Sequence, residues 1–366
     1  MTAQALITGA TGFLGRHLLS ALWAQGIRPG VLVRQRSAWG TEAWHSQGGT
    51  AAVIEGHPLA SEQWRADPAL EGVRSIYHLA GIVRHTRSAP EEMLELNVKG
   101  TLDMVHVAAR LGARLVFVSS SGTVGCFRAP DMRAEEDAPF VESLAGRWPY
   151  YASKIRAERE ARSLADKLGV ELVIVRPPVL LGPEDHRRRS TGYVQKVLDG
   201  KVPLVPSGGM HFTDVRDVAT ALARIPALSS PRAVYHLPGT ASTLREFFAM
   251  VTEVSGAPVI ERPLPHWAAI GLAQIGALGG RLHASMPDPV VLEMATCFWG
   301  LATLFAHELG YAPRPGRQTL SDTVSWLRAN PGGAHAHDAQ APKRSRAASA
   351  SATSASNKPL APPPGA

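Results

Sequence analysis

The sequence predicts an α/β fold built on a doubly wound parallel sheet, with a small C-terminal lobe. Three observations favour this fold class. Short aliphatic runs alternate with amphipathic stretches up to about residue 175, a glycine-rich turn follows the first run, and the chain has 366 residues of which 45% are hydrophobic. A chain of this length buries a large core. The chain has only two cysteines, which excludes a disulfide-built scaffold.

The elements of the first half follow one another as strand and helix. The first strand is expected at residues 5–8, and a helix over 13–25 ends before Gly26 because its apolar residues share one face up to that point. A later helix opens at Pro90 and closes at Gly112, which are residues typical of helix ends. Further strands are expected at residues 31–33, 51–55, 75–79, 115–119 and 171–175, and further helices at 90–111 and 150–168.

The second half is punctuated by Gly and Pro and predicts a substrate lobe, mainly residues 181–330, after a dinucleotide-binding part, mainly 1–180. A capping box, Thr243 to Glu246, marks one helix start. The uncharged apolar run 267–280 is about 14 residues long, too short to span a bilayer, so we expect a packed helix; a membrane-surface contact or a pocket wall is the alternative. Residues 331–366 are rich in Ala, Ser and Pro and are predicted to be a disordered tail.

The charge and the N-terminus bear on partners and location. The net charge is +7, but the basic residues are scattered or lie in the tail, so no nucleic-acid partner is expected. The first residues carry no signal-peptide pattern, and no transmembrane segment is expected, which predicts a cytoplasmic protein. The histidines show no metal-ligand spacing, so no metal is expected.

Three glycines, Gly9, Gly12 and Gly15, stand between the first strand and the first helix with the spacing G-x-x-G-x-x-G. One permits a tight turn, one lets the backbone approach a pyrophosphate, and one allows the helix to pack closely on the sheet. The free N–H groups of the helix N-terminus favour an anion. The strand before this turn and the helix after it make a dinucleotide site the favoured interpretation over a merely structural turn.

The residue after the second strand indicates which dinucleotide binds. An acidic residue there bonds the ribose of NAD, whereas an arginine accommodates the 2′-phosphate of NADP. This chain has Arg34 and Arg36 and no carboxylate between them. We therefore expect NADP(H) to be preferred, with Arg34 as the phosphate partner and NAD(H) as the alternative. Ordinary solvated surface charge is the other interpretation of both arginines.

Tyr150 and Lys154 are four residues apart on a predicted helix, so their side chains share one face. An ammonium group beside a phenol favours the phenolate and makes the phenol a better acid-base group near neutral pH. Ser120 follows the fifth strand, at the sheet edge where ligands bind in such folds. These three residues predict a site that acts on a carbonyl or an alcohol, although a Tyr and a Lys at this spacing also occur by chance.

These motifs resemble those of extended short-chain dehydrogenase/reductases. The likeness is to the NAD-dependent epimerase/dehydratase family, in its dihydroflavonol-reductase-like group, and it implies a Rossmann-type sheet. The matching segments are residues 8–15 (TGATGFLG), 78–81 (HLAG), 97–101 (NVKGT), 118–124 (VSSSGTV), 149–154 (PYYASK) and 176–183 (RPPVLLGP).

The resemblance implies a role for each matching position and suggests a homodimer. Ser120 takes the position of the catalytic Ser or Thr, Tyr150 that of the acid-base residue, and Lys154 that of the residue which holds the nicotinamide ribose and lowers the Tyr pKa. The positions implied to contact the cofactor are Gly9, Thr11, Gly12, Phe13, Leu14, Gly15, Ala80, Lys154 and Pro177.

Several alternatives stay open from the sequence. Tyr151 rivals Tyr150, and Ser119 and Ser121 rival Ser120. Charged residues on the loop 84–87, and the run 186–189, either face a small-molecule substrate or are solvated. Gly56 and His57 replace the family's usual Gly-Asp pair, which leaves the adenine contact in doubt.

The favoured function is a reductase or dehydrogenase that transfers hydride between a nicotinamide cofactor and a small molecule. Nucleotide-sugar epimerases or dehydratases with tightly held NAD(P) are the first alternative, because they use the same three residues. A non-enzymatic dinucleotide sensor is the second, although a sensor needs only the glycine turn. Fold-level likeness does not reach the identity of the substrate.

Overall fold

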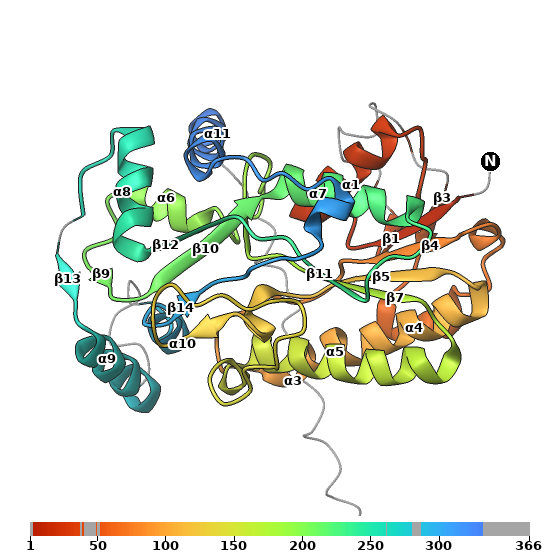
Figure 1. The fold of residues 1–366 in the computed structure, drawn as a ribbon, viewed down its shortest axis with the longest axis horizontal. Coiled ribbons are helices and arrows are strands. Elements are labelled where there is room, and N and C mark those ends of the chain that lie inside the picture. Colours follow the sequence, from red (N-terminus) through yellow and green to blue (C-terminus); the bar gives the residue numbers. More distant parts are fainter. Residues whose placement is uncertain are drawn as a thin grey trace, which may run out of the picture.

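The computed structural model describes residues 3–36, 39, 49, 52–260, 262–279 and 287–331. The tail predicted to be disordered lies, from residue 332 on, outside these described residues. Figure 1 shows a central sheet with helices above and below it and a second group of elements beyond one of its edges.

The central sheet has seven parallel strands in the order β11-β7-β5-β4-β1-β2-β3, which confirms the predicted Rossmann-type α/β class. Each strand of the first half begins and ends within about one residue of its predicted position. The strands are β1 (Ala5–Thr8), β2 (Gly30–Val33), β3 (Ala52–Glu55), β4 (Ser75–His78), β5 (Arg114–Val118), β7 (Leu172–Arg176) and β11 (Val234–His236).

The strand order places a switch point beside β1. The chain runs outward from β1 to β2 and β3, and it then returns to β4 on the other side of β1. Thr8, the last residue of β1, is paired with Leu32 on one side and with His78 on the other. The loops after β1 and β4 therefore diverge at the carboxyl ends of the strands, which is where ligands bind in open α/β sheets.

Helices cover both faces of the sheet (Figure 1). Successive strand residues point to opposite faces, so Ile7 and Val116 pack with one helix layer while Leu6 and Leu115 pack with the other. The first layer contains α1 (Phe13–Ala24) and α7 (Val215–Arg224), and the second contains α4 (Gly100–Leu111) and α5 (Pro149–Leu168).

The helix predicted over residues 90–111 is interrupted. It consists of α3 (Pro90–Leu94), a π-helical turn over Glu95–Lys99, and α4. The predicted helix and both of its ends are therefore confirmed, and the π-helical turn at its centre is the feature that the sequence did not predict. Such turns are frequent at functional sites, and the side chain of Asn97 leaves this one to bond the loop after β4.

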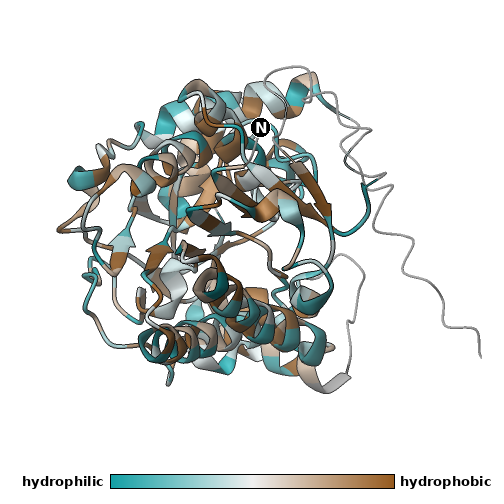
Figure 2. Ribbon diagram, turned by 90° about the vertical axis from the view of Figure 1, so that its right-hand side faces the viewer, coloured by the Kyte–Doolittle hydropathy of each residue, from teal (hydrophilic) through white to brown (hydrophobic). Residues whose placement is uncertain are grey.

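The second group of elements forms a lobe around a three-stranded sheet, in the order β12-β10-β8. Phe247, Val251 and Leu320 lie in one buried cluster at its core. Figure 2 shows hydrophobic residues in the interior and hydrophilic residues along outward helix sides. The elements are β8 (Val179–Leu181), α6 (Gly192–Leu198), β9 (Val205–Pro206), β10 (Gly209–Asp214), β12 (Thr240–Thr243), α8 (Leu244–Ser255), β13 (Pro263–Leu264), α9 (His266–Gly279), α10 (Pro289–Met294) and α11 (Gly316–Ala329).

Helix α9 differs from the expected packed helix. Ala269 and Ala273 are buried, but Trp267 is 78% exposed and Ile275 is 50% exposed. Only one side of α9 is therefore packed against the lobe. The run is apolar on all sides, so its hydropathy does not reveal which side faces out. Among the described helices, none combines the length and the apolar character needed to cross a membrane.

The capping box at the start of α8 is present as predicted and can be tested. The Thr243 hydroxyl accepts from the Glu246 backbone N–H at 3.1 Å, and the Glu246 carboxylate accepts from the Thr243 N–H at 2.8 Å. Replacing Thr243 with Ala should lower the free energy of unfolding by about 1 kcal/mol because the Glu246 N–H loses its acceptor. Urea unfolding measures this change. Thr243→Ser keeps the acceptor and should stay within a few tenths of a kcal/mol; an equal loss in both variants would contradict the capping role.

Candidate active site

The glycine turn leads from β1 into α1 and leaves no room for side chains. Gly9 has φ of +75°, and a Cβ added to it would lie 2.8 Å from the backbone nitrogen of Ala80. A Cβ on Gly15 would lie 2.3 Å from the carbonyl oxygen of Gly9. Gly12 caps α1 without a side-chain bond, and no acidic residue lies in the first turn. The turn therefore presents backbone N–H groups to an anion, which fits the pyrophosphate of a dinucleotide.

The end of β4 is held against this turn by a buried threonine. The Thr8 hydroxyl lies 2.8 Å from Nδ1 of His78 and accepts from the Ala80 N–H at 3.2 Å. Burial lowers the pKa of His78 to about 3, so its ring is neutral. Ala80, implied by the resemblance to flank the cofactor, is thus fixed beside Gly9.

Arg34 lies directly after β2, at the same edge of the sheet as the glycine turn, and its side chain is exposed. Burial and the nearby Arg34 charge together lower the pKa of His57. The neighbouring Arg36 donates to the Val53 carbonyl at 2.7 Å, so its guanidinium is bound to β3. The two arginines after β2 therefore differ in their surroundings.

Ser120, Tyr150 and Lys154 are brought together at the carboxyl end of β5. Ser120 lies two residues after this strand, and its side chain is near enough to the Tyr150 hydroxyl, in the first turn of α5, to lower the Tyr150 pKa against the effect of burial. Lys154, one helical turn further on, is buried and donates from Nζ to the carbonyl of Val118 at 2.9 Å. Pro177, at the end of β7, accepts from the Ser121 N–H at 2.9 Å and so lies beside the same strand end.

Burial is the largest cause of the pKa shifts of Tyr150 and Lys154. Burial raises the pKa of Tyr150 to about 12, although the nearby Ser120 side chain opposes the shift. Burial lowers the pKa of Lys154 to about 8. Lys154 was expected to lower the Tyr150 pKa, but its ammonium group bonds the Val118 carbonyl, and burial keeps the phenol protonated at neutral pH.

The rival residues have other contacts. The ring of Tyr151 lies over Gly122, where an added Cβ would be 2.0 Å from a ring carbon, and its centroid is 5.3 Å from that of Trp299. Ser119 donates to the carboxylate of Glu158 at 2.5 Å. Tyr151 and Ser119 are thus used in packing and in a buried ion network, whereas the Ser120 side chain lies near the Tyr150 hydroxyl.

A family model described as the NAD dependent epimerase/dehydratase family matches residues 5–237, from β1 through β11. The chain belongs to this family. The matched residues include the glycine turn, Ser120, Tyr150 and Lys154, and the family is one of NAD(P)-dependent enzymes.

Similar proteins cover nearly the whole chain. A putative dihydroflavonol 4-reductase of Synechocystis sp. is 27% identical over 334 residues, which is 88% of this chain and 94% of that protein. Sterol demethylase protein B of Methylococcus capsulatus is 27% identical over 345 residues, with 88% and 98% covered. The crystal structure of gox2253 superposes with a TM-score of 0.74 at 28% identity and covers 89% of this chain and 98% of its own.

A buried ion network that was not predicted from the sequence holds the end of β5, where Ser119 and Ser120 follow the strand. Glu158 is fully buried on α5, and Arg176 at the end of β7 donates to its carboxylate from Nη2 at 2.6 Å. Burial opposes the charge on Glu158, but the Arg176 guanidinium holds the pKa of this carboxyl below its usual value. Glu158 also accepts from Ser119 and Thr123. Nothing in the local sequence distinguishes Glu158 from Glu160, the other glutamate of α5, which is half-buried.

Asn97 is a second residue whose role the sequence left open, although its motif was recognised. Its side chain accepts from the Ile82 N–H at 2.8 Å and donates to the Ile82 carbonyl at 3.0 Å and to Ser153 Oγ at 2.9 Å. It therefore fastens the loop after β4 to the helix that carries Tyr150. An Asn within an otherwise amphipathic helical stretch was the available signal.

An aromatic wall adjoins Tyr150. The ring of His85, on the loop after β4, is 5.5 Å from that of Tyr150 and 6.2 Å from that of Tyr151. Burial lowers the pKa of His85 to about 4, and its Nδ1 has no hydrogen-bond partner in the described part of the chain. Of the charged loop 84–87, it is therefore the neutral His85 that lies beside the catalytic candidates.

Removing the Glu158 charge should destabilise the protein strongly. Glu158→Gln leaves the buried Arg176 without its carboxylate, which we expect to lower the free energy of unfolding at pH 7 by about 3 to 5 kcal/mol. Replacing both residues, with Arg176→Met as the second change, should cost less than Glu158→Gln alone. Glu160→Gln on the outer side of α5 is the matched control and should change stability by less than about 0.5 kcal/mol.

The pH dependence of the free energy of unfolding provides a second test of the pair of Glu158 and Arg176. Because the pKa of Glu158 is lowered in the folded protein, ionisation of this carboxyl stabilises the fold. The stabilisation is complete above the ordinary pKa of 4.5 and is lost as the pH falls through the pKa of the folded state. Glu158→Gln should remove this component from the urea-unfolding profile below pH 4.5. If the free energy of unfolding depended on pH below 4.5 in the same way in Glu158→Gln and in the parent protein, the pair would not stabilise the fold.

Proposed function

We propose that this protein is an NADP(H)-dependent oxidoreductase that interconverts a carbonyl and a secondary alcohol, with Ser120, Tyr150 and Lys154 as its catalytic residues. The juxtaposition of Ser120 and Tyr150 at the end of β5 carries the proposal, because it brings two hydroxyl groups together at the strand end that also binds Lys154. A bound nicotinamide would supply or accept the hydride.

The protonation states of Tyr150 and Lys154 favour reduction of a carbonyl over oxidation of an alcohol. A Tyr150 pKa of about 12 keeps the phenol protonated at neutral pH, which is the form that donates a proton to a carbonyl oxygen. Ser120 holds the same oxygen by a hydrogen bond. Lys154, with a pKa of about 8, is mostly charged at pH 7 and stabilises the phenolate that remains after the transfer.

The cofactor residues follow from the turn and the strand ends. The backbone around Gly9, Gly12 and Gly15 binds the pyrophosphate, and Arg34 binds the 2′-phosphate. Lys154 holds the nicotinamide ribose. The other cofactor contacts in this proposal are Thr11, Phe13, Leu14, Ala80 and Pro177.

The surroundings of Tyr150 favour an apolar, ring-containing substrate. His85 and Tyr151 place aromatic faces beside the Tyr150 ring, and Trp299 extends the same wall. The names of two relatives refer to a dihydroflavonol and to a sterol, which are polycyclic and largely apolar. Neutral His85 offers one polar contact to such a molecule.

The acid role of Tyr150 can be tested with a conservative pair of variants. The purified protein is titrated with NADPH and NADH by fluorescence, and apolar cyclic ketones are then screened by NADPH oxidation. Tyr150→Phe should lower kcat by about 10² to 10⁴ while leaving the Kd of NADPH nearly unchanged. Tyr151→Phe keeps the aromatic wall and should retain most of the activity. Tightly retained NAD with no net NADPH oxidation would overturn the proposal in favour of an epimerase or dehydratase.

The role of Arg34 predicts a change in cofactor choice. Arg34→Ser removes a charge-assisted bond to the 2′-phosphate, so the Kd of NADPH should rise about tenfold or more while that of NADH stays the same. Isothermal titration with both cofactors measures the ratio. Arg36→Ser, which loses a bond to β3 instead, should change the ratio little. Equal weakening of both cofactors would remove Arg34 from this role.

A further inference from the structure

The two cysteines of the chain lie near each other, one on a short strand and the other directly before the strand that pairs with it. Strand β6 (Cys126–Phe127) runs antiparallel to β14 (Phe298–Trp299), with Trp299 opposite Cys126. Cys297 is two residues before Trp299, so its side chain points to the same face as Cys126 and lies diagonal to it. Both cysteines are free and buried, and each side chain shifts the pKa of the other.

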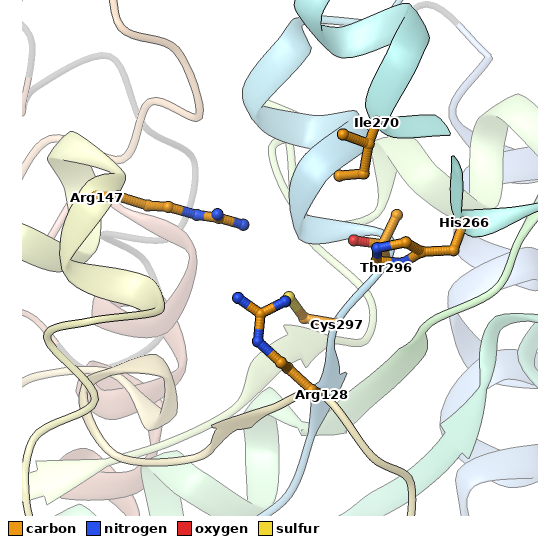
Figure 3. A pocket seen from close by; sticks show the side chains of 6 residues that line it. All are labelled: Arg128, Arg147, His266, Ile270, Thr296 and Cys297. Carbon is orange, nitrogen blue, oxygen red and sulfur yellow. The ribbon is translucent and has the colours of Figure 1, made fainter. Parts of the chain in front are cut away.

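A cavity of about 410 Å³ opens in front of Cys297. Figure 3 shows the guanidinium groups of Arg128 and Arg147 pointing into the space beside the Cys297 sulfur. The remaining lining residues are His266 and Ile270 of α9, and Thr296. The cavity therefore combines a thiol with two cations, which is a site for an anionic, thiol-reactive molecule.

The two thiols differ in acidity. The neighbouring Cys126 thiol lowers the pKa of Cys297 against the effect of burial, and the charges of Arg147 and Arg128 add to this. The neighbouring Cys297 and burial raise the pKa of Cys126. When protonated, Cys297 donates to the Glu293 carbonyl at 3.9 Å, a long contact. Cys297 is thus the nucleophile of the pair, and it is also the one that lines the cavity.

We propose that Cys126 and Cys297 form an oxidisable pair that reacts with small anionic disulfides of the glutathione type entering this cavity. The Cys297 thiolate attacks one sulfur of the disulfide, forms a mixed disulfide and releases one thiolate. The Cys126 thiol then loses its proton to solvent and attacks the Cys297 sulfur, which forms the internal disulfide and releases the second thiolate. Two protein thiols are oxidised, and the reagent is reduced to two thiols.

The location of the pair connects it to the candidate active site. Trp299 of β14 contacts the ring of Tyr151, whose own ring is 5.0 Å from that of Tyr150. The internal disulfide would fasten β14 to β6 directly behind this aromatic wall. This proposal does not depend on the reaction proposed for Tyr150.

The test uses the full-length reduced protein, whose two cysteines make the products simple to assign. Incubation with glutathione disulfide should remove the mass of two hydrogen atoms and produce one cross-linked peptide with Cys126 and Cys297, reversible by dithiothreitol. Cys126→Ser should stop at a single glutathione adduct on Cys297, and Cys297→Ser should stay unmodified. Modification of Cys126 first, or no internal disulfide under these conditions, would overturn the proposal.

The charge selectivity is tested separately. Arg128→Gln should slow the reaction with glutathione disulfide about fivefold, as expected for the loss of about 1 kcal/mol of attraction, and leave the rate with neutral 2-hydroxyethyl disulfide unchanged. The unchanged neutral rate also shows that the variant is folded. Arg156→Gln on the outer side of α5 is the matched control. Equal rates for both reagents in the parent protein would refute an anion-selective cavity.

Discussion

The buried pair of Glu158 and Arg176 is the interaction on which the site geometry depends. Glu158 follows Lys154 by one turn of α5, and Arg176 ends β7, so the pair fixes the helix that carries Tyr150 against the sheet. Ser119 bonds the same carboxylate, which fixes the strand end that carries Ser120. Sliding α5 by even part of a turn would leave a buried charge unpaired, and such a charge is costly. The ion pair thus stabilises the alignment of three side chains that it does not itself touch.

The central sheet could be predicted because each of its strands and covering helices is marked by residues within or next to that segment. Each strand is an aliphatic run between turn residues, and each helix has its own boundary residues such as Gly26 or Pro90. The second lobe could not be predicted in the same way, because its strands pair across large sequence separations and some contain only two residues, as in β6 with β14. Helix α9 shows the same limit: its sequence is apolar on all sides, and only the neighbouring elements decide that Trp267 stays outside.

The same distinction divides the residues of the candidate site. Gly9, Gly15, Tyr150 and Lys154 lie at fixed spacings within one turn or one helix, so spacing alone predicted which residues face one another. Arg176, by contrast, donates to the backbone of Glu136, and Glu136 accepts from Thr303, 167 positions away. Contacts over such separations leave no periodic trace in a single sequence. Sequence reasoning therefore found the groups proposed to do the chemistry and missed those that hold them in place.

The second lobe is interlocked with the first half at the candidate site. Strand β14 pairs with β6, which comes shortly after Ser120, and the Trp299 ring lies beside those of Trp148 and Tyr151. Arg87 and the Trp148 indole both donate to Glu293, which closely precedes Cys297. The aromatic wall is therefore built from both parts of the chain. Trp299 on β14 and Tyr151 therefore share a ring contact, whereas the glycine turn lies between β1 and α1 in the other part of the chain. We expect a change at β14 to act on the aromatic wall before it acts on the glycine turn.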